Sequence, residues 1–349
     1  MTLQSFIALW THRYVKYSHI AKAHLLAYQA WFSLSIKKWR LSSQKRELIA
    51  VVRTEHFGDI VATEPLSRHI RLLYPKAHII WFVKPAFKEL IDTNPNVDET
   101  FPEFCVTQRR VLIGTGIFDQ VLELQFRNNN HCPVCDVFVE NPVANAAGIN
   151  VFTYLNFGNL LTGFAKTAGL TLPEDDQPRI YLQDKHRQKV DNLGLTEPYI
   201  VVHCQSNYTP KDWPTSNWER LIQELTARYP FKIVEVGLRS NLSIENPSYR
   251  SLCGQLSIME TAEVIRRATY FIGLDSGPSH LANATGTVGF VLMGSLNNFQ
   301  NYNPYSGDYG NQKNCVLVQK EGLPCAQLSY EYVLETIQNT FANPQEANA

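Results

Sequence analysis

Two kinds of hydrophobic spacing divide the chain. Over residues 3–38, large apolar residues recur at steps of three and four, which predicts a helix because such positions share one face. No proline or glycine interrupts this stretch. From residue 47 onward, short apolar runs alternate with amphipathic stretches, a rhythm typical of strands alternating with helices. We therefore expect a helical arm, residues 1–46, followed by an α/β body.

The body contains two series of strands. The first series is predicted at 48–52, 78–83 and 121–126, with helices at 64–75, 85–95 and 151–169. The second series is predicted at 199–204, 231–237, 269–275 and 288–294, with helices at 216–230 and 257–268. Ser216 is expected to cap the first of these two helices, and Ser257 and Glu260 have the spacing of a capping box. Alternating elements favour parallel sheets covered on both faces. This predicts two doubly wound domains, residues 47–180 and 181–349, joined by the polar stretch 174–184.

Charge sets the arm apart from the body. The 349 residues are 44% hydrophobic, which is enough to form a core for each of two domains. The arm carries eight Lys and Arg and no Asp or Glu, so the rest of the chain is acidic because the formal net charge is +0. Its mixture of Trp, Tyr and basic residues suits a lipid headgroup layer. The alternative is that the arm packs on its own protein or on a second copy. Nucleic acid is not expected as a partner, because the body lacks a broad basic face.

The cysteines indicate a reducing compartment. There are seven, at irregular spacings, which is not the pattern of a secreted disulfide scaffold. His12, Arg13 and Lys16 interrupt any signal-peptide core, and no apolar run approaches the ~20 residues of a membrane span. We expect a cytoplasmic protein that can lie on the inner face of the cytoplasmic membrane.

One cysteine pair has metal-ligand spacing. Cys132 and Cys135 form a Cys-x-x-Cys motif, which is half of a zinc site. A second ligand pair is needed, and neither Cys105 nor His203 stands at a diagnostic spacing. We therefore interpret these residues as free cysteines in a loop, and we expect no metal and no cofactor.

Three polar stretches each follow a predicted strand. They are HFGDIVATEP (56–65), HCQSNYTPKDWP (203–214) and GLDSGPSHLANATG (273–286). In open parallel sheets, ligands bind beyond the carboxyl ends of the strands. These stretches are therefore expected to form the functional site.

The third and second stretches suit a phosphate. Asp275, Ser276 and Gly277 lie where a strand gives way to a helix, whose N-terminus attracts anions, and His280 follows one turn later. Lys211 stands in a strand-to-helix loop and can act as a point charge on a diphosphate. The alternatives are that Asp275 or Ser276 only caps the helix, that His280 packs, and that Lys211 is solvated.

The first stretch suits a general base. Asp59 is the carboxylate in the turn between strand and helix, where it can take a proton from a hydroxyl group. The alternative is a helix cap. Glu55, His56 and Glu64 are nearby substitutes for the same role.

These stretches, in this order, resemble glycosyltransferase family 9, the lipopolysaccharide heptosyltransferases. The matching pieces are FGDIVATEP (57–65), YPKAHIIWFVKPAFKELIDTNPNVDE (74–99), KDWPTSNWERLI (211–222) and DSGPSHLANATG (275–286), and the resemblance covers roughly residues 48–340. It implies a GT-B fold, in which two Rossmann-like doubly wound domains face a cleft. The donor, typically ADP-heptose, then binds the C-terminal domain, and a growing lipopolysaccharide core binds the N-terminal one. The family inverts the anomeric centre in one displacement and needs no metal.

The resemblance also implies roles for single residues. Asp59 matches the catalytic base and Lys211 the contact to the donor phosphates. The residues matching the donor site are Asp275, Ser276, Gly277 and His280. Further candidates for that site are Gly58, Ser206, Thr209 and Arg239.

Two departures from the family pattern leave alternatives open. Family members carry an acidic residue just after the glycine that matches Gly237, whereas this chain has Arg239 near that place. A transferase or epimerase for another nucleotide sugar is therefore an alternative. The basic arm is not part of the usual pattern either. It suggests a tether to the membrane that holds a lipid-linked glycan acceptor, or a membrane-associated scaffold without activity.

Overall fold

The computed structural model describes residues 3–126 and 130–342, and it divides the chain into two compact units. Unit 1 comprises Met1–Glu55, Ser67–Val151 and Phe164–Thr171. Unit 2 comprises His56–Leu66, Phe152–Gly163 and Leu172–Ala349. Two short segments of the first half of the chain, one of them with Asp59, thus belong to unit 2. The domain boundary at residue 180 stays a prediction.

Unit 1 is built on a parallel sheet with the strand order β3-β2-β1-β4. The strands are β1 (Leu48–Val52), β2 (His78–Val83), β3 (Glu99–Pro102) and β4 (Gln120–Glu123). The bounds of β1 and β2 agree with the prediction, and every residue of β1 is buried, as expected for a strand covered on both faces. The unit's helical segments include η1 (Pro85–Phe87), α4 (Lys88–Asp92), α5 (Val106–Gly114) and α6 (Pro142–Ala146). A two-stranded antiparallel hairpin, β5 (His131–Cys132) and β6 (Val137–Phe138), completes it.

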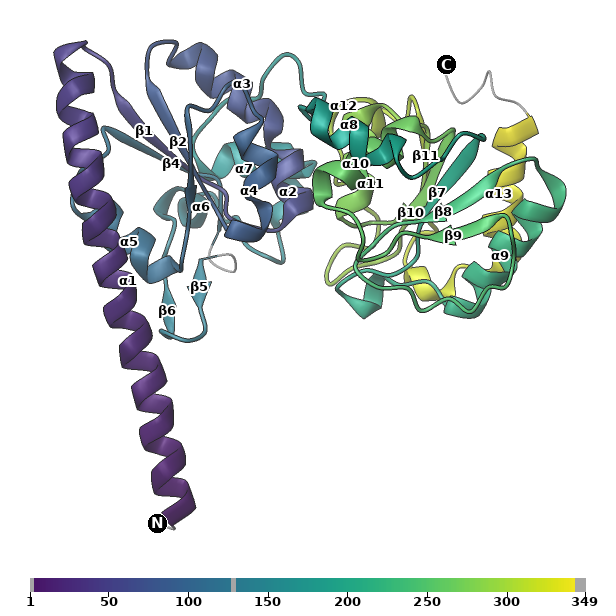
Figure 1. The fold of residues 1–349 in the computed structure, drawn as a ribbon, viewed down its shortest axis with the longest axis horizontal. Coiled ribbons are helices and arrows are strands. Elements are labelled where there is room, and N and C mark those ends of the chain that lie inside the picture. Colours follow the sequence, from purple (N-terminus) through teal and green to yellow (C-terminus); the bar gives the residue numbers. More distant parts are fainter. Residues whose placement is uncertain (1–2, 127–129, 343–349) are drawn as a thin grey trace. The chain divides into compact units, whose positions relative to one another are not determined.

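The arm forms one long helix, α1 (Leu3–Ser43). Its second half packs on unit 1 through Ala27, Leu34 and Leu41, which join a core with residues of β1, β2 and α5. Its first turns extend beyond the sheet (Figure 1), and residues 4–15 are all exposed. Within the described residues, no helix is long and apolar enough to cross a membrane.

Unit 2 is built on a larger parallel sheet, with the strand order β12-β11-β10-β7-β8-β9. Its strands are β7 (Tyr199–His203), β8 (Lys232–Glu235), β9 (Tyr249–Ser251), β10 (Tyr270–Leu274), β11 (Gly289–Leu292) and β12 (Cys315–Val318). Its longer helices are α8 (Asp184–Asp191), α9 (Thr215–Arg228), α10 (Ile258–Arg267), α11 (Gly277–Thr285) and α13 (Tyr330–Ala342). One core joins α9 and α13 to the sheet around Trp213 and Trp218, while α10 packs against both α8 and α11. Alternating strands and helices therefore produce a Rossmann-like layer structure (Figure 1).

Some local predictions are confirmed and two are wrong. The capping box of α10 is confirmed, because the Ser257 hydroxyl accepts from the Glu260 N–H at 3.2 Å and the Glu260 carboxylate accepts from the Ser257 N–H at 2.9 Å. Ser216 is not a cap, since α9 already begins at Thr215, directly after a proline. The helix predicted over 151–169 is instead a 3-10 turn, η3 (Tyr154–Phe157), followed by α7 (Leu160–Thr167). Gly158 separates them at φ +119°, a backbone conformation that no helix contains.

Candidate functional site

Two short helices of unit 2 meet at the candidate site. They are α2 (Phe57–Ala62), which follows β1, and α11, which follows β10. A methyl group at Gly58 would lie 2.9 Å from Cδ2 of His280, and one at Gly277 would overlap the Phe57 ring. The two helices approach so closely because glycine stands at both contact positions.

A pocket of about 440 Å³ opens at this junction, and all of its lining residues belong to unit 2. Eight of the ten residues predicted from the sequence line it: Gly58, Asp59, Ser206, Lys211, Asp275, Ser276, Gly277 and His280. The described lining does not include Thr209 or Arg239. Thr209 begins the short turn η4 (Thr209–Lys211), which carries Lys211. The structure thus brings a carboxylate, a cation and a helix N-terminus to one hollow.

The cation is fixed by a buried carboxylate. The Lys211 ammonium donates to Oδ2 of Asp275 at 2.7 Å and to the Asp275 carbonyl at 3.3 Å. The Asp275 side chain is only 6% exposed, whereas that of Lys211 is 25% exposed. Lys211 therefore reaches the pocket with its charge held in place, and Asp275 positions the lysine.

Two tyrosines from the loop before α12 (Gly307–Gly310) complete the hold on this carboxylate. Tyr302 donates to Oδ2 of Asp275 at 2.8 Å, and Tyr305 donates to Oδ1 at 3.2 Å. Sequence reasoning missed both residues, because tyrosines after a strand are common and no spacing links them to Asp275. Their hydroxyls stay protonated, since burial raises the pKa of each well above its usual range.

Electrostatics assign charge states to the buried groups. Burial on its own would raise the pKa of Asp275, but the charge and hydrogen bond of Lys211 outweigh it and lower that pKa. Burial lowers the pKa of His280 despite the nearby Asp275 and Asp59 carboxylates, so the ring is neutral at pH 7. It lies 4.7 Å from the Tyr305 ring. The site therefore combines one charged lysine with a neutral imidazole.

The helix-cap alternative does not describe the observed contacts of Asp275 and Ser276. Ser276 is the N-cap residue of α11, but its hydroxyl donates to the Leu274 carbonyl at 3.1 Å and makes no cap bond within the described structure. The Asp275 carboxylate is bound by Lys211 and the tyrosines instead. For α2 the N-cap residue is His56, and Asp59 lies inside the first turn. Because Pro278 has no N–H group, an anion at α11 would meet the N–H groups that precede it.

A second pocket of about 340 Å³, also in unit 2, contains Arg239. It shares Ser206, Ser276 and Gly277 with the first pocket, and Leu238 and Leu256 add apolar surface. His203 lines its floor with a ring nitrogen 2.9 Å from the Val236 carbonyl, and burial lowers the pKa of this histidine. The two adjoining hollows suit a ligand with one anionic part and one flat, partly apolar part.

The predicted cysteine motif lies in unit 1, away from these residues in the chain and in a different unit. Cys132 and Cys135 are joined there by Cys105 and by His19 of α1. His203 does not take part, because it is buried in unit 2. Sequence reasoning missed His19, which stands 86 positions before Cys105 in an otherwise ordinary amphipathic helix.

Comparisons with known proteins find similar sequences and folds. Residues 160–331 match the model of glycosyltransferase family 9 (heptosyltransferase), a span that includes Lys211 and Asp275 but not Asp59. A lipopolysaccharide heptosyltransferase 3 of Escherichia coli is 27% identical over 118 residues, which is 31% of this chain and 35% of that protein. The one of strain K12 is 25% identical over 283 residues, 69% of this chain and 80% of that protein.

A solved structure shows the same fold. The E. coli ADP-heptose lipopolysaccharide heptosyltransferase II superposes with a TM-score of 0.59 at 15% identity, covering 86% of this chain and 99% of that one. Its two-domain architecture is the GT-B fold predicted from the sequence. A scaffold without activity is therefore not the interpretation that these similarities favour. The resemblance is confirmed to this extent: residues 160–331 match the glycosyltransferase family 9 model, and the chain has the GT-B fold.

Proposed function

We propose that the chain transfers a heptose, with inversion and without a metal ion in the reaction, from ADP-heptose to a lipopolysaccharide core or another cell-surface glycan. One observation carries this proposal: Asp59, Lys211 and the N-terminus of α11 line a single pocket. The names of the similar proteins supply the sugar and the acceptor class.

The donor diphosphate belongs beside Lys211 in this proposal. Asp275 holds the ammonium group in place at 2.7 Å, and the first N–H groups of α11 add positive potential. These groups stabilise the negative charge that develops on the departing diphosphate, a task that a divalent cation performs in other transferases. The second pocket, with Leu238 and Arg239, takes the nucleoside.

The acceptor hydroxyl belongs beside Asp59. As its oxygen attacks the anomeric carbon, the carboxylate takes the hydroxyl proton. The bond from that carbon to the diphosphate oxygen breaks on the opposite side, and the electron pair leaves with ADP. One such displacement inverts the configuration. Neutral His280 lies in the same pocket as Asp59 and Lys211 and can donate a hydrogen bond without adding charge.

The test separates catalysis from binding. Asp59→Asn keeps the shape of the side chain but cannot accept a proton, so kcat for transfer from ADP-heptose should fall about 10²–10⁴-fold. The affinity for ADP, measured by calorimetry, should change less than about twofold, because Asp59 is assigned no contact with the nucleotide. Exposed Glu174→Gln is the matched control and should leave both values unchanged. Transfer by Asp59→Asn at the wild-type kcat would remove Asp59 from the mechanism.

Arg239 favours a second candidate, a transferase or epimerase for another nucleotide sugar. Its guanidinium lines the pocket assigned to the nucleoside, where an additional phosphate or a different base would meet it. Thermal unfolding with ADP, GDP, UDP and their sugars distinguishes the two. A ligand at 100 times its Kd stabilises the folded state by about 2.7 kcal/mol. The proposal requires the largest shift with ADP species and its loss in Lys211→Ala, with exposed Lys185→Ala as control. A shift with UDP or GDP species alone would change the sugar.

We also propose that the arm places the enzyme on the inner face of the cytoplasmic membrane. The exposed first turns of α1 carry Trp10, Tyr14 and Tyr17 next to basic residues, a combination that suits anionic headgroups. Co-sedimentation with vesicles of anionic and of neutral lipids tests this. Binding to anionic vesicles alone, lost on removal of residues 1–15, is the expected result, and equal recovery in the supernatant of both would refute it.

A further inference from the structure

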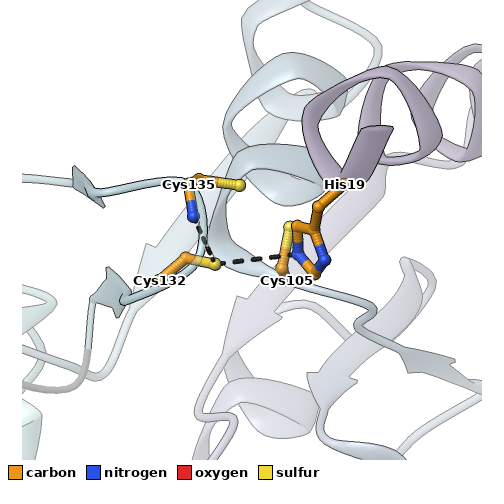
Figure 2. A group of neighbouring side chains, drawn as sticks. All are labelled: His19, Cys105, Cys132 and Cys135. Carbon is orange, nitrogen blue, oxygen red and sulfur yellow. Dashed lines mark hydrogen bonds between the residues drawn. The ribbon is translucent and has the colours of Figure 1, made fainter. Parts of the chain in front are cut away.

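Four side chains with metal-binding atoms meet in unit 1, and the proposed transfer reaction uses none of them. They are His19, Cys105, Cys132 and Cys135, and their ligand atoms all lie within 4.8 Å of one another. Figure 2 shows the imidazole of His19 and the three thiols converging from separate parts of the chain. Three cysteines and one histidine are a common ligand set of structural zinc.

The backbone positions explain how the four residues come together. His19 lies on α1, Cys105 is the residue before the first turn of α5, and Cys132 ends β5. Cys135 stands in the turn between β5 and β6, where Asp136 adopts a left-handed φ of 56°. All of these elements belong to unit 1.

The spacing fits a small tetrahedral ion. Ligand atoms on zinc, with bonds of about 2.0–2.3 Å, lie about 3.5–3.8 Å apart. Here Sγ of Cys132 is 3.8 Å from Nε2 of His19, so this pair already has the required separation. No two of the ligand atoms are more than 4.8 Å apart, so a separation needs to shorten by at most about 1 Å to match that geometry. Side-chain rotation at a hairpin turn supplies such a change.

The surroundings are those of a closed structural site. The three cysteines are at most 7% exposed and pack with Ala23, Val106 and neighbouring apolar side chains. The Phe104 ring stacks on His19 at 4.6 Å and fixes the orientation of the imidazole. The Cys135 N–H donates to Sγ of Cys132 at 3.5 Å, as N–H groups do toward metal-bound sulfur. Lys16 of α1 lies 3.8 Å from Asp136 in the hairpin turn, so an ion pair also joins these two segments.

The hairpin offers a reason for a metal at this place. Strands β5 and β6 pair through only two residues each, and so short a hairpin is not stable by itself in water. A metal ion would join the hairpin to α5 and to the point on α1 where its buried stripe begins at Ala23. Apolar packing alone would not require four donor atoms from three segments to meet.

We propose that His19, Cys105, Cys132 and Cys135 bind one Zn²⁺ ion in a tetrahedral structural site that fastens α1 to unit 1. Because four protein groups fill the coordination sphere, the ion takes no part in the transfer reaction. Three thiols lose their protons when it binds. The site is independent of the proposed function, since it requires neither the donor pocket nor Asp59.

The experiment uses the full chain, purified without a metal-chelating tag or column. Elemental analysis should find one zinc ion per chain, and exchange for Co²⁺ should produce the visible bands of tetrahedral cobalt–thiolate coordination. Zinc should fall to near zero in Cys132→Ser/Cys135→Ser and in His19→Ala. It should stay near one per chain in His19→Cys, which keeps four ligands. Cys315→Ser, at a buried cysteine of unit 2, is the matched control.

A second measurement covers a variant that fails to fold. In the wild-type protein, removal of zinc by a chelator should make three more thiols reactive toward an alkylating agent. Three outcomes overturn the proposal: wild-type zinc content in Cys132→Ser/Cys135→Ser, iron bound by the same residues in place of zinc, or a disulfide between Cys132 and Cys135 found by mass spectrometry in protein kept under reducing conditions.

Discussion

The pair of Lys211 and Asp275 allows the electrostatics of the site to be measured. At 2.7 Å, two unit charges attract by about 6 kcal/mol at an effective dielectric constant of about 20. Desolvation of both groups offsets most of that attraction. Removal of one partner of a buried pair costs about 3–5 kcal/mol, and the quarter exposure of Lys211 reduces this to about 2–3 kcal/mol. Lys211→Met keeps the apolar stem and removes only the charge.

The Asp275 carboxylate, left without its cation in Lys211→Met, determines the expected stabilities of the variants. In Lys211→Met, Asp275 remains buried between Tyr302 and Tyr305 without its cation, so the chain loses about 2–3 kcal/mol of unfolding free energy at pH 7. For a unit of roughly 200 residues this lowers Tm by about 5–10 °C. Lys211→Met/Asp275→Asn removes both charges. It should be more stable than Lys211→Met, with a coupling of about 1.5–2.5 kcal/mol between the two sites.

Urea unfolding of the wild type, both single variants and the double variant closes the cycle. The loss in Lys211→Met should be smaller at pH 5 than at pH 8. Without its cation, burial raises the pKa of Asp275 above the unfolded value, so the folded state takes up a proton as the pH falls. Additive effects of the two substitutions, within about 0.5 kcal/mol, would refute the reasoning. Equal losses at both pH values would show that no carboxylate is left without a counter-ion.

Two further predictions concern the junction of α2 and α11. Gly277→Ala should lower the free energy of unfolding by about 1–3 kcal/mol and reduce transfer activity, because its methyl group displaces the Phe57 ring. The double variant Gly277→Ala/Phe57→Ala should regain stability, and Gly114→Ala, with open space around it, is the control. A Gly277→Ala variant with wild-type stability would contradict the contact. The free energy of unfolding should also fall as the pH drops from about 7 to 5, because the pKa of buried His280 lies below its unfolded value near 6.5 and only the unfolded chain gains the proton. Chemical denaturation at a series of pH values should show a weaker pH dependence in His280→Gln. An unchanged pH dependence would show that His280 is protonated in the fold.

The sequence predicts elements best where local rules decide. The runs at Leu48–Val52 and His78–Val83 are apolar at nearly every position, and burial on both faces of a parallel sheet leaves such runs no other place. The capping box of Ser257 is equally local, because both of its bonds join residues three apart. Ser216 failed as a cap because Pro214 already fixes the backbone for a helix that begins one residue earlier.

The sequence predicted most of the pocket-lining residues but not the residues that reach the sites from distant segments. The pocket gathers residues that follow β7 and β10, since these neighbouring parallel strands of one sheet present their carboxyl ends at one edge, and residues of α2 join them. Tyr302 and Tyr305 reach Asp275 from a loop whose course depends on tertiary packing, about 30 positions further along. His19 meets Cys105 only because α1 packs against α5, and helix periodicity alone specifies a buried face but not its partner.

The unbroken course of α1 has a geometric consequence. The twelve exposed residues 4–15 span about 18 Å at 1.5 Å per residue. A flexible linker of equal length would reach about as far on average but in any direction. The helix continues directly into the turns that carry Ala27 and Leu34. A surface that binds the tip therefore sets both the distance and the orientation of the unit 1 sheet relative to that surface. Removal of four residues would rotate the tip by about 40° about the helix axis and shorten the helix by about 6 Å. Removal of seven residues would leave the rotational position of the tip almost unchanged. The length of the arm thus sets the rotational position of its tip about the helix axis as well as the distance of the tip from unit 1.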